Sequence, residues 1–330
     1  MSFLFPSSTI TFEAALRDLA NGSPKARAMA AHALGDVTEA VEKRRALDAL
    51  IRALDDDLPQ VRSEACAALG ELGEPGAVSH LIKRLDDGAA PVRQNAAIAL
   101  GTIRSADAFE PLAEALKQGP ADLRFQAATS LAEVDPARAF PLVLAALEDR
   151  DQEVVGAAAL SVGAIGKLDE SRRATAIPAL TAKLDHSNPG TRFDVAYALA
   201  ELGDPTGRSA LAAALADLDR AWDAVSALGQ LAATEELAKA VATRDAPMEA
   251  RVLAAGKLLS LGVDSEAARA LLLEALTVRK VNVRGLAIEQ LAEVGGPWAK
   301  QPLEKLARSG KGTELLEPIA QALRAIEARP

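Results

Sequence analysis

The chain has 330 residues, of which 49% are hydrophobic but only 3% aromatic, and its formal net charge is −9. An acidic balance argues against non-specific nucleic-acid binding, because clustered Lys and Arg are needed to replace the counterions of phosphates. Cys66 is the only cysteine, which excludes an internal disulfide and a multi-cysteine metal site. We expect a soluble cytoplasmic protein.

The first residues, MSFLFPSSTITFEAALRDL, lack a basic segment followed by a long apolar one. They predict a capped helix entry rather than a signal peptide. No uninterrupted apolar run approaches the roughly 20 residues that a membrane helix needs. We therefore expect no membrane partner.

A helical motif then recurs every 31 residues. Four segments align: VRSEACAALGELG (61–73), VRQNAAIALGTIR (92–104), LRFQAATSLAEVD (123–135) and VVGAAALSVGAIG (154–166). With small changes in length the pattern continues, so that one core position recurs along the chain at Leu34, Leu69, Leu100, Leu131, Val162, Leu199, Leu228, Leu258, Leu291 and Leu323. A near-fixed period of this size is typical of a stacked array.

A second helix precedes this one in each unit, as in ALDALIRALDD (46–56) and AIPALTAKLDH (176–186). Leu and Ala recur there at the spacing of one helix face. Pro and Gly mark the joints, for example Gly73, Pro75 and Gly76. Each unit is predicted as helix A, turn, helix B, turn, and the chain as an all-α solenoid of about ten units.

The pattern resembles HEAT repeats of the short-repeat class found in phycobilin lyase subunits and many bacterial proteins. An Asp precedes an Arg by six residues in three of its strings, Asp56 to Arg62, Asp87 to Arg93 and Asp245 to Arg251. Arg124, Arg192 and Arg284 occupy the same Arg position, whereas Val155 and Ala221 replace it. The resemblance covers about residues 10–327 and implies a right-handed superhelix, a fold that hosts many unrelated binding roles.

The intervals are longer where extra residues occur near 39–45 and 167–173. The second insertion allows a mild break near 166–175, which would divide the ten predicted units into two groups of five. We nevertheless expect one solenoid over residues 1–330.

The Arg positions admit two interpretations. They could form a basic binding stripe, or each Arg could pair with a turn Asp of its own or a neighbouring unit, as the resemblance implies. We favour the structural role, in which such pairs fix geometry and add little net stability.

Groups suited to catalysis or metal binding are few. His32, His80 and His186 lie in different units, and none belongs to a His-x-x-x-His or His-Glu pair. A metal site needs convergent ligands. Cys66, on the flank of a B helix, is expected to be an unreactive thiol. We therefore predict no metal, no cofactor and no catalytic residue.

The outward side of the B helices offers the main candidate site. On a wheel at 100° per residue, Val61, Ala65 and Leu69 face the core, whereas Ser63 and Ala67 point away from it. B helices line the concave surface of a HEAT stack, so both positions should face its groove. We call their equivalents along the chain the Ser63 series and the Ala67 series.

Aromatic and large apolar side chains gather in these two series. The Ser63 series contains Phe125, Phe193, Trp222 and Val252, and the Ala67 series contains Ile98, Leu160 and Tyr197. Exposed apolar strips usually mark binding surfaces, and interface cores are rich in aromatic residues. We predict that these seven residues bind a partner. Alternatively, the rings fill gaps between neighbouring B helices.

The preferred hypothesis is a non-catalytic scaffold or adaptor that binds a partner protein in the concave groove. HEAT-like DNA glycosylases are one alternative, because they stack bases on groove aromatics beside a carboxylate. Phe193, Tyr197 and Trp222, with Asp194 and Asp223, are similar in residue type, although the acidic balance disfavours nucleic acid. A phycobilin lyase-like subunit, suggested by the repeat resemblance alone, would need a chromophore and a phycobiliprotein.

Overall fold

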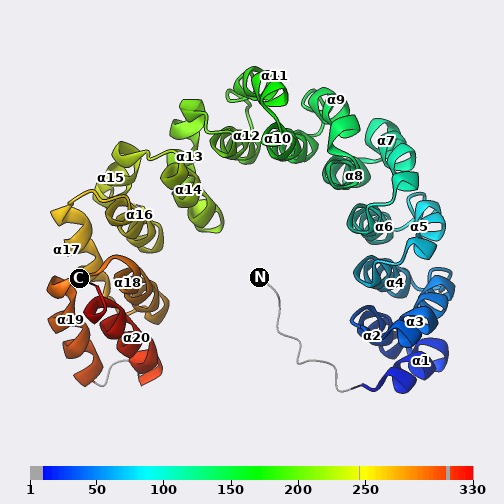
Figure 1. The fold of residues 1–330 in the computed structure, drawn as a ribbon, viewed down its shortest axis with the longest axis horizontal. Helices are drawn as coiled ribbons and strands as arrows, with labels where there is room; N and C mark the ends of the chain where they lie inside the picture. Colours follow the sequence, from blue (N-terminus) through cyan, green and yellow to red (C-terminus); the bar gives the residue numbers. More distant parts are fainter. Residues whose placement is uncertain (1–9, 245, 310–312, 330) are drawn as a thin grey trace. The chain divides into compact units, whose positions relative to one another are not determined.

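The computed structural model describes residues 10–244, 246–309 and 313–329 (Figure 1). Over these residues the chain forms 20 α-helices, four short 3-10 helices and no strand, which confirms the all-α prediction. Residues 1–9 of the predicted helix entry lie outside this description. Thr11 does cap the first helix, because its hydroxyl accepts a hydrogen bond from the Ala14 amide at 3.3 Å.

The contacts divide the chain into two compact units, Met1–Arg172 and Arg173–Pro330. This boundary falls within the segment 166–175, where a mild break was expected. That the two units form one continuous solenoid stays a prediction, and each unit is described by itself below.

The first unit contains α1 to α10. Their bounds are α1 Phe12–Asn21, α2 Pro24–Gly35, α3 Ala40–Ala53, α4 Pro59–Leu72, α5 Val78–Arg84, α6 Ala90–Ile103, α7 Phe109–Gln118, α8 Ala121–Val134, α9 Pro136–Ala146 and α10 Gln152–Gly166. Two 3-10 helices, η1 Pro75–Ala77 and η2 Ala106–Ala108, lead into α5 and α7.

The second unit contains α11 to α20, and the boundary itself lies inside α11. Their bounds are α11 Glu170–Thr181, α12 Pro189–Glu201, α13 Arg208–Ala214, α14 Leu218–Gln230, α15 Thr234–Ala242, α16 Met248–Ser260, α17 Glu266–Ala275, α18 Val281–Val294, α19 Pro297–Arg308 and α20 Leu316–Glu327. The 3-10 helices η3 Pro205–Gly207 and η4 Thr313–Leu315 lead into α13 and α20.

Odd-numbered helices are the predicted A helices and even-numbered helices the B helices. Successive B helices pack side by side, α2 to α10 in the first unit and α12 to α20 in the second. Within each unit the B helices lie on the inner side of the curved row and the A helices on the outer side (Figure 1).

The recurring core position lies between the two rows. Its residues from Leu34 to Leu291 are all fully or almost fully buried. Leu323 is only partly buried, because α18 is the one B helix that packs beside α20. The 31-residue period therefore identified the core correctly.

Small residues let the B helices approach one another closely. A Cβ atom added to Gly70 on α4 would lie 2.9 Å from the Ala99 Cα on α6. One added to Gly101 on α6 would lie 3.0 Å from the Ser130 Cα on α8. Distances this short leave no room for a larger side chain, which accounts for the many Ala and Gly residues in these helices.

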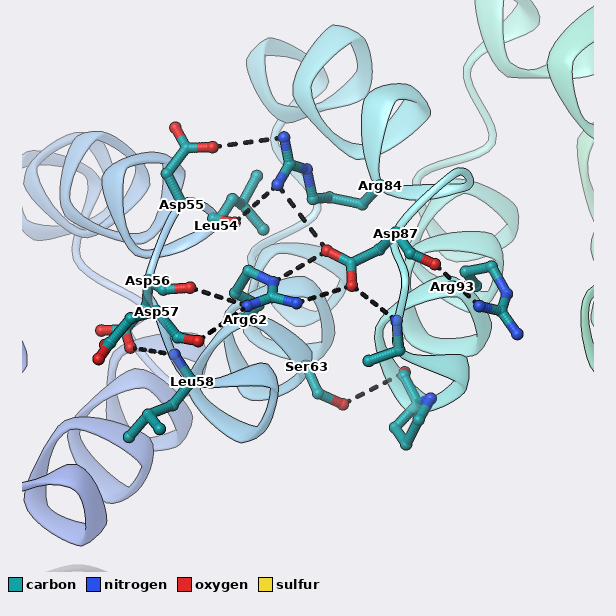
Figure 2. Close-up of polar contacts among 12 residues, drawn as sticks. Leu54, Asp55, Asp56, Asp57, Leu58, Arg62, Ser63, Arg84, Asp87 and Arg93 are labelled. Carbon is teal, nitrogen blue, oxygen red and sulfur yellow. Dashed lines mark hydrogen bonds and ion pairs between the residues drawn. The ribbon is translucent and has the colours of Figure 1, made fainter.

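The Arg position links one helix pair to the next helix pair along the chain (Figure 2). Arg62 donates through Nη1 to the Asp56 carbonyl of its own turn at 2.9 Å. Its Nε and Nη2 donate to the carboxylate of Asp87, in the following turn, at 2.9 and 2.8 Å. Asp87 also accepts the Ala89 amide at 2.9 Å. Arg62 and Asp87 thus join two consecutive turns by a bidentate ionic bond.

The bidentate link recurs in the first unit as Arg27 to Asp56 and Arg124 to Asp149, whereas Arg93 pairs with Asp122 through Nη2 alone. Arg192, Arg251 and Arg284 instead donate to backbone carbonyls in the second unit, and none of them pairs with a carboxylate among the described residues. Asp245 of the predicted Asp–Arg string lies outside the described residues. The structural role of the Arg series is confirmed for the first unit.

Replacing Arg62 by Ala should destabilise the chain by roughly 2–3 kcal/mol, because the buried Asp87 carboxylate loses its bidentate partner and keeps only Arg84 at 3.9 Å and the Ala89 amide. Chemical denaturation would measure the loss. Arg308→Ala is the matched control, since Arg308 pairs with Glu304 at 3.0 Å on an exposed helix face and should change nothing measurable. Equal effects of the two variants would contradict the structural role of the link.

The stability of the chain should also depend on pH through Asp87. The hydrogen bond from Arg62 holds the pKa of Asp87 below its usual range. The pair therefore stabilises the fold above the unfolded-state pKa of about 3.9, and this contribution is lost as pH falls through the lowered pKa. Asp87→Asn should be less stable at neutral pH and lose less stability on acidification. Asp107→Asn, at an exposed position, should retain the parent's pH profile.

Candidate protein-binding surface

The Ala67 series faces solvent on the B-helix side, as predicted. Ile98 on α6 is 44% exposed, and Leu160 on α10 is also exposed. Tyr197 on α12 is half-buried. The exception is Gly256 on α16, which is buried. For this series the wheel places the side chains correctly.

The Ser63 series is mostly covered by the next B helix, so the prediction that it faces a groove is wrong. Ser63 is buried, and its hydroxyl donates to the Pro91 carbonyl on α6 at 3.2 Å (Figure 2). Asn95 on α6 donates back to the Ser63 hydroxyl at 2.9 Å. The wheel of one helix shows which side avoids the core, but not which part of that side its neighbour covers.

Two predicted partner-binding residues are therefore inaccessible. Val252 on α16 has no exposed surface, and Phe193 on α12 is only 7% exposed. Both belong to the hydrophobic core of the second unit. Phe125 on α8, in the first unit, is half-buried. The alternative that rings fill gaps between B helices thus holds for Phe193.

Trp222 on α14 departs from this rule. Its side chain is 55% exposed although it belongs to the Ser63 series. Leu218, one turn earlier on the same helix, is exposed as well. Residues four apart lie next to each other on a helix surface, so the two form an apolar pair. Sequence reasoning missed Leu218, which its spacing from Trp222 could have indicated.

Phe193 supports the half-buried Tyr197 from below. The two ring centroids are 6.0 Å apart and the rings are tilted by 42°. The guanidinium of Arg220, on α14, lies 5.7 Å from the Phe193 ring and donates to Asp217 at 3.2 Å. Tyr197 thus packs beside a ring that is itself buried between α12 and α14.

Carboxylates surround the Ala67 series and cations are missing from it. The series itself and the positions three residues before and four residues after it contain no Lys or Arg. They contain nine acidic residues: Asp36, Glu64, Glu71 and Glu133 in the first unit, and Asp194, Glu201, Asp223, Glu289 and Glu293 in the second. The open side of the B helices is therefore anionic in both units.

Two of these carboxyls titrate unusually. Burial raises the pKa of Asp194 to about 6, and the charge of Arg220 partly opposes that rise. Burial also raises the pKa of Glu71, with further increases from the nearby Asp36 and Glu64 and an opposing effect from His32. Burial is the main cause of both shifts, and like charges add to it at Glu71 alone.

Cys66 is buried in α4. Burial raises the pKa of the Cys66 thiol to about 12, so it is a poor nucleophile. In the part of the chain that the structure describes, no three His, Cys, Asp or Glu side chains are grouped to hold a metal ion. None of the described helices could span a bilayer.

Several solved structures resemble this chain. Yeast importin-beta is 13% identical, with 95% of this chain and 52% of that chain covered and a TM-score of 0.64. A second importin-beta structure is 15% identical, with coverage of 96% and 52% and a TM-score of 0.60. The chain thus spans about half the length of these importins, and at such low identity the likeness shows the fold.

The complex of CpcE and CpcF of phycocyanin lyase from Nostoc sp. PCC7120 is 25% identical, with 86% of this chain and 98% of that chain covered and a TM-score of 0.41. A search of curated proteins finds no significant match.

Family models agree with the repeat pattern. The model for PBS lyase HEAT-like repeats matches residues 92–118. The model for HEAT repeats matches residues 12–101, 109–173 and 163–232, which is more than half of the sequence. With its paired helices, its recurring buried leucines and this match, the chain belongs to the HEAT repeat family.

Proposed function

We propose that the chain is a non-catalytic interaction scaffold that binds a partner protein through the open side of its B helices. The observation that carries this proposal is Trp222, a large aromatic side chain that is more than half exposed on α14. Trp is the residue most enriched at the energetic centres of protein interfaces.

The neighbours of Trp222 support a binding role. Leu218 extends its apolar surface by one turn, and Tyr197 on the adjacent B helix adds a ring that Phe193 holds in position. An anchored ring loses little conformational entropy when a partner binds, which favours affinity. The first unit contributes Ile98 and Leu160 on its own B helices.

The anionic surroundings indicate which partner surface fits. A segment that combines an apolar side chain with Lys or Arg would meet Trp222 and the carboxylates of Asp194 and Asp223 together. Complementary charge raises the association rate and excludes partners of like charge. The same carboxylates repel phosphates, and Phe193 is buried, so a glycosylase-like role is not proposed.

Replacing Trp222 by Ala should weaken partner binding about 30-fold and leave the melting temperature close to that of the parent. The partner would be captured by pull-down, identified by mass spectrometry and purified for affinity measurements. Val41→Ala is the control, because Val41 is an exposed apolar residue on the A helix α3 and should bind like the parent.

The Phe193→Ala variant provides the comparison for Trp222, because Phe193 is assigned to the core. It should cost about 3–5 kcal/mol of folding stability, since it removes a buried ring. If Trp222→Ala lowers the melting temperature as much as Phe193→Ala does while the folded fraction keeps its affinity, Trp222 is a core residue and the proposal fails.

Partner affinity should also fall as ionic strength rises, because salt screens the carboxylates around the Ala67 series. Titrations at several salt concentrations would measure this. The Asp223→Asn variant should show a weaker salt dependence. An affinity independent of salt would show that the carboxylates take no part in binding.

A further inference from the structure

A cavity in each unit lies next to a repeat Arg, and the two cavities are equivalent. The first, of about 650 Å³, is lined by Leu16 and Leu19 on α1 and by Arg27 on α2. The second, of about 510 Å³, is lined by Leu273, Leu276 and Arg284. These three follow their counterparts in the first cavity at one constant offset in sequence.

The residues of the opposite walls also correspond to one another, at a constant sequence offset of their own. Arg52, Ala53 and Asp56 line the first cavity, and Lys305, Leu306 and Ser309 line the second. In this correspondence Ser309 of the second cavity takes the place of Asp56 of the first cavity. The second cavity therefore lacks the Asp56 carboxylate that lines its counterpart beside the repeat Arg.

In the first cavity the Arg has its full set of partners. Arg27 donates through Nε and Nη2 to the two carboxylate oxygens of Asp56 at 2.8 and 2.9 Å. This bidentate arrangement is the strongest geometry that a guanidinium and a carboxylate can form. It shows what the same position accommodates when an acid is present.

In the second cavity the Arg lacks that partner. Arg284 is only 8% exposed, and its Nη1 donates to the carbonyls of Val278 and Arg279 at 2.9 and 3.1 Å. Its Nε is buried and has no hydrogen-bond partner among the described residues. The Ser309 hydroxyl, which donates to the Leu306 carbonyl at 2.7 Å, is uncharged and does not neutralise Arg284 as a carboxylate would.

The charge of this cavity is therefore unbalanced. Arg284 and Lys305 both line it, and none of the described residues in its wall is Asp or Glu. A buried cation without a counter-ion is costly, and an anion that enters would remove that cost. The rest of the wall is apolar, formed by Leu273, Leu276, Pro302 and Leu306.

We propose that the cavity between α17 and α19 is a binding site for a carboxylate attached to a short aliphatic group. The carboxylate occupies the place that Asp56 has in the first unit and accepts hydrogen bonds from Nε and Nη2 of Arg284. The aliphatic group packs on the leucines. This site involves the A helices α17 and α19 and does not depend on the function proposed for the B-helix side.

Calorimetric titration of the full chain with four probes tests the ligand class. Hexanoate should bind saturably and raise the melting temperature, whereas 1-hexanol, which has the same apolar part and no charge, should not. Acetyl-Leu-Leu with a free carboxyl terminus and its amide provide the same comparison for a peptide. Tighter binding of hexanoate would identify a free aliphatic acid as the natural source, and tighter binding of the peptide acid a chain terminus.

Variants locate the site. Arg284→Gln should weaken binding of the carboxylate probes at least about tenfold. Ser309→Asp should weaken it similarly while raising the melting temperature, because it supplies the carboxylate from within the chain. Arg251→Gln is the control, since the Nε and Nη2 of that repeat Arg both donate to the Val241 carbonyl, and it should bind hexanoate like the parent.

Three results would overturn the proposal. They are the absence of saturable binding by both carboxylate probes, equal binding of hexanol and hexanoate, and unchanged hexanoate affinity in both Arg284→Gln and Ser309→Asp. Because Ser309→Asp is expected to stabilise the chain, loss of folding in Arg284→Gln would not prevent the comparison.

Discussion

The close approach of successive B helices is the constraint on which the other features depend. Where Gly70 and Gly101 meet the backbone of the next helix, no larger side chain fits. Each B helix inside a row is therefore covered on its core side and along both flanks, and only a narrow strip remains open. Large apolar side chains must lie in the core, as Phe193 does, or stand outside, as Trp222 does. Few aromatic side chains are exposed on such a chain, so one that is exposed supports a binding role.

The same constraint explains what the sequence could and could not predict. The period identified every unit, and the buried leucines follow it without exception up to Leu291. The Ala67 series was placed correctly because it lies opposite the core. Val252 and Phe193 were misplaced because the flank that a neighbouring helix covers depends on how the two helices pack, which a wheel of one helix does not contain. The cavity beside Arg284 could have been suspected from the missing Asp, but its apolar wall needed the structure.

The charges of the chain are sorted by position. In the first unit the repeat arginines meet carboxylates of the following turn, and in the second unit they meet backbone carbonyls. Arginines occupied in these turns leave the open strip of the B helices to carboxylates. In each unit the open strip is thus richer in carboxylates than in cations, which composition alone would not show.

The Arg–Asp pairs between consecutive turns also affect how the chain unfolds. In a repeat array each unit contacts only its neighbours, so cooperativity is set by the coupling at each interface. From Arg27 to Asp149 every break between units would strand a buried charge, which favours opening of α2–α10 as one block. The second unit has no such Arg–Asp pairs between consecutive turns among its described residues. Its helix pairs can therefore unfold one at a time more easily. Amide hydrogen exchange along the chain would accordingly show one slow, uniform block followed by a graded series of faster ones.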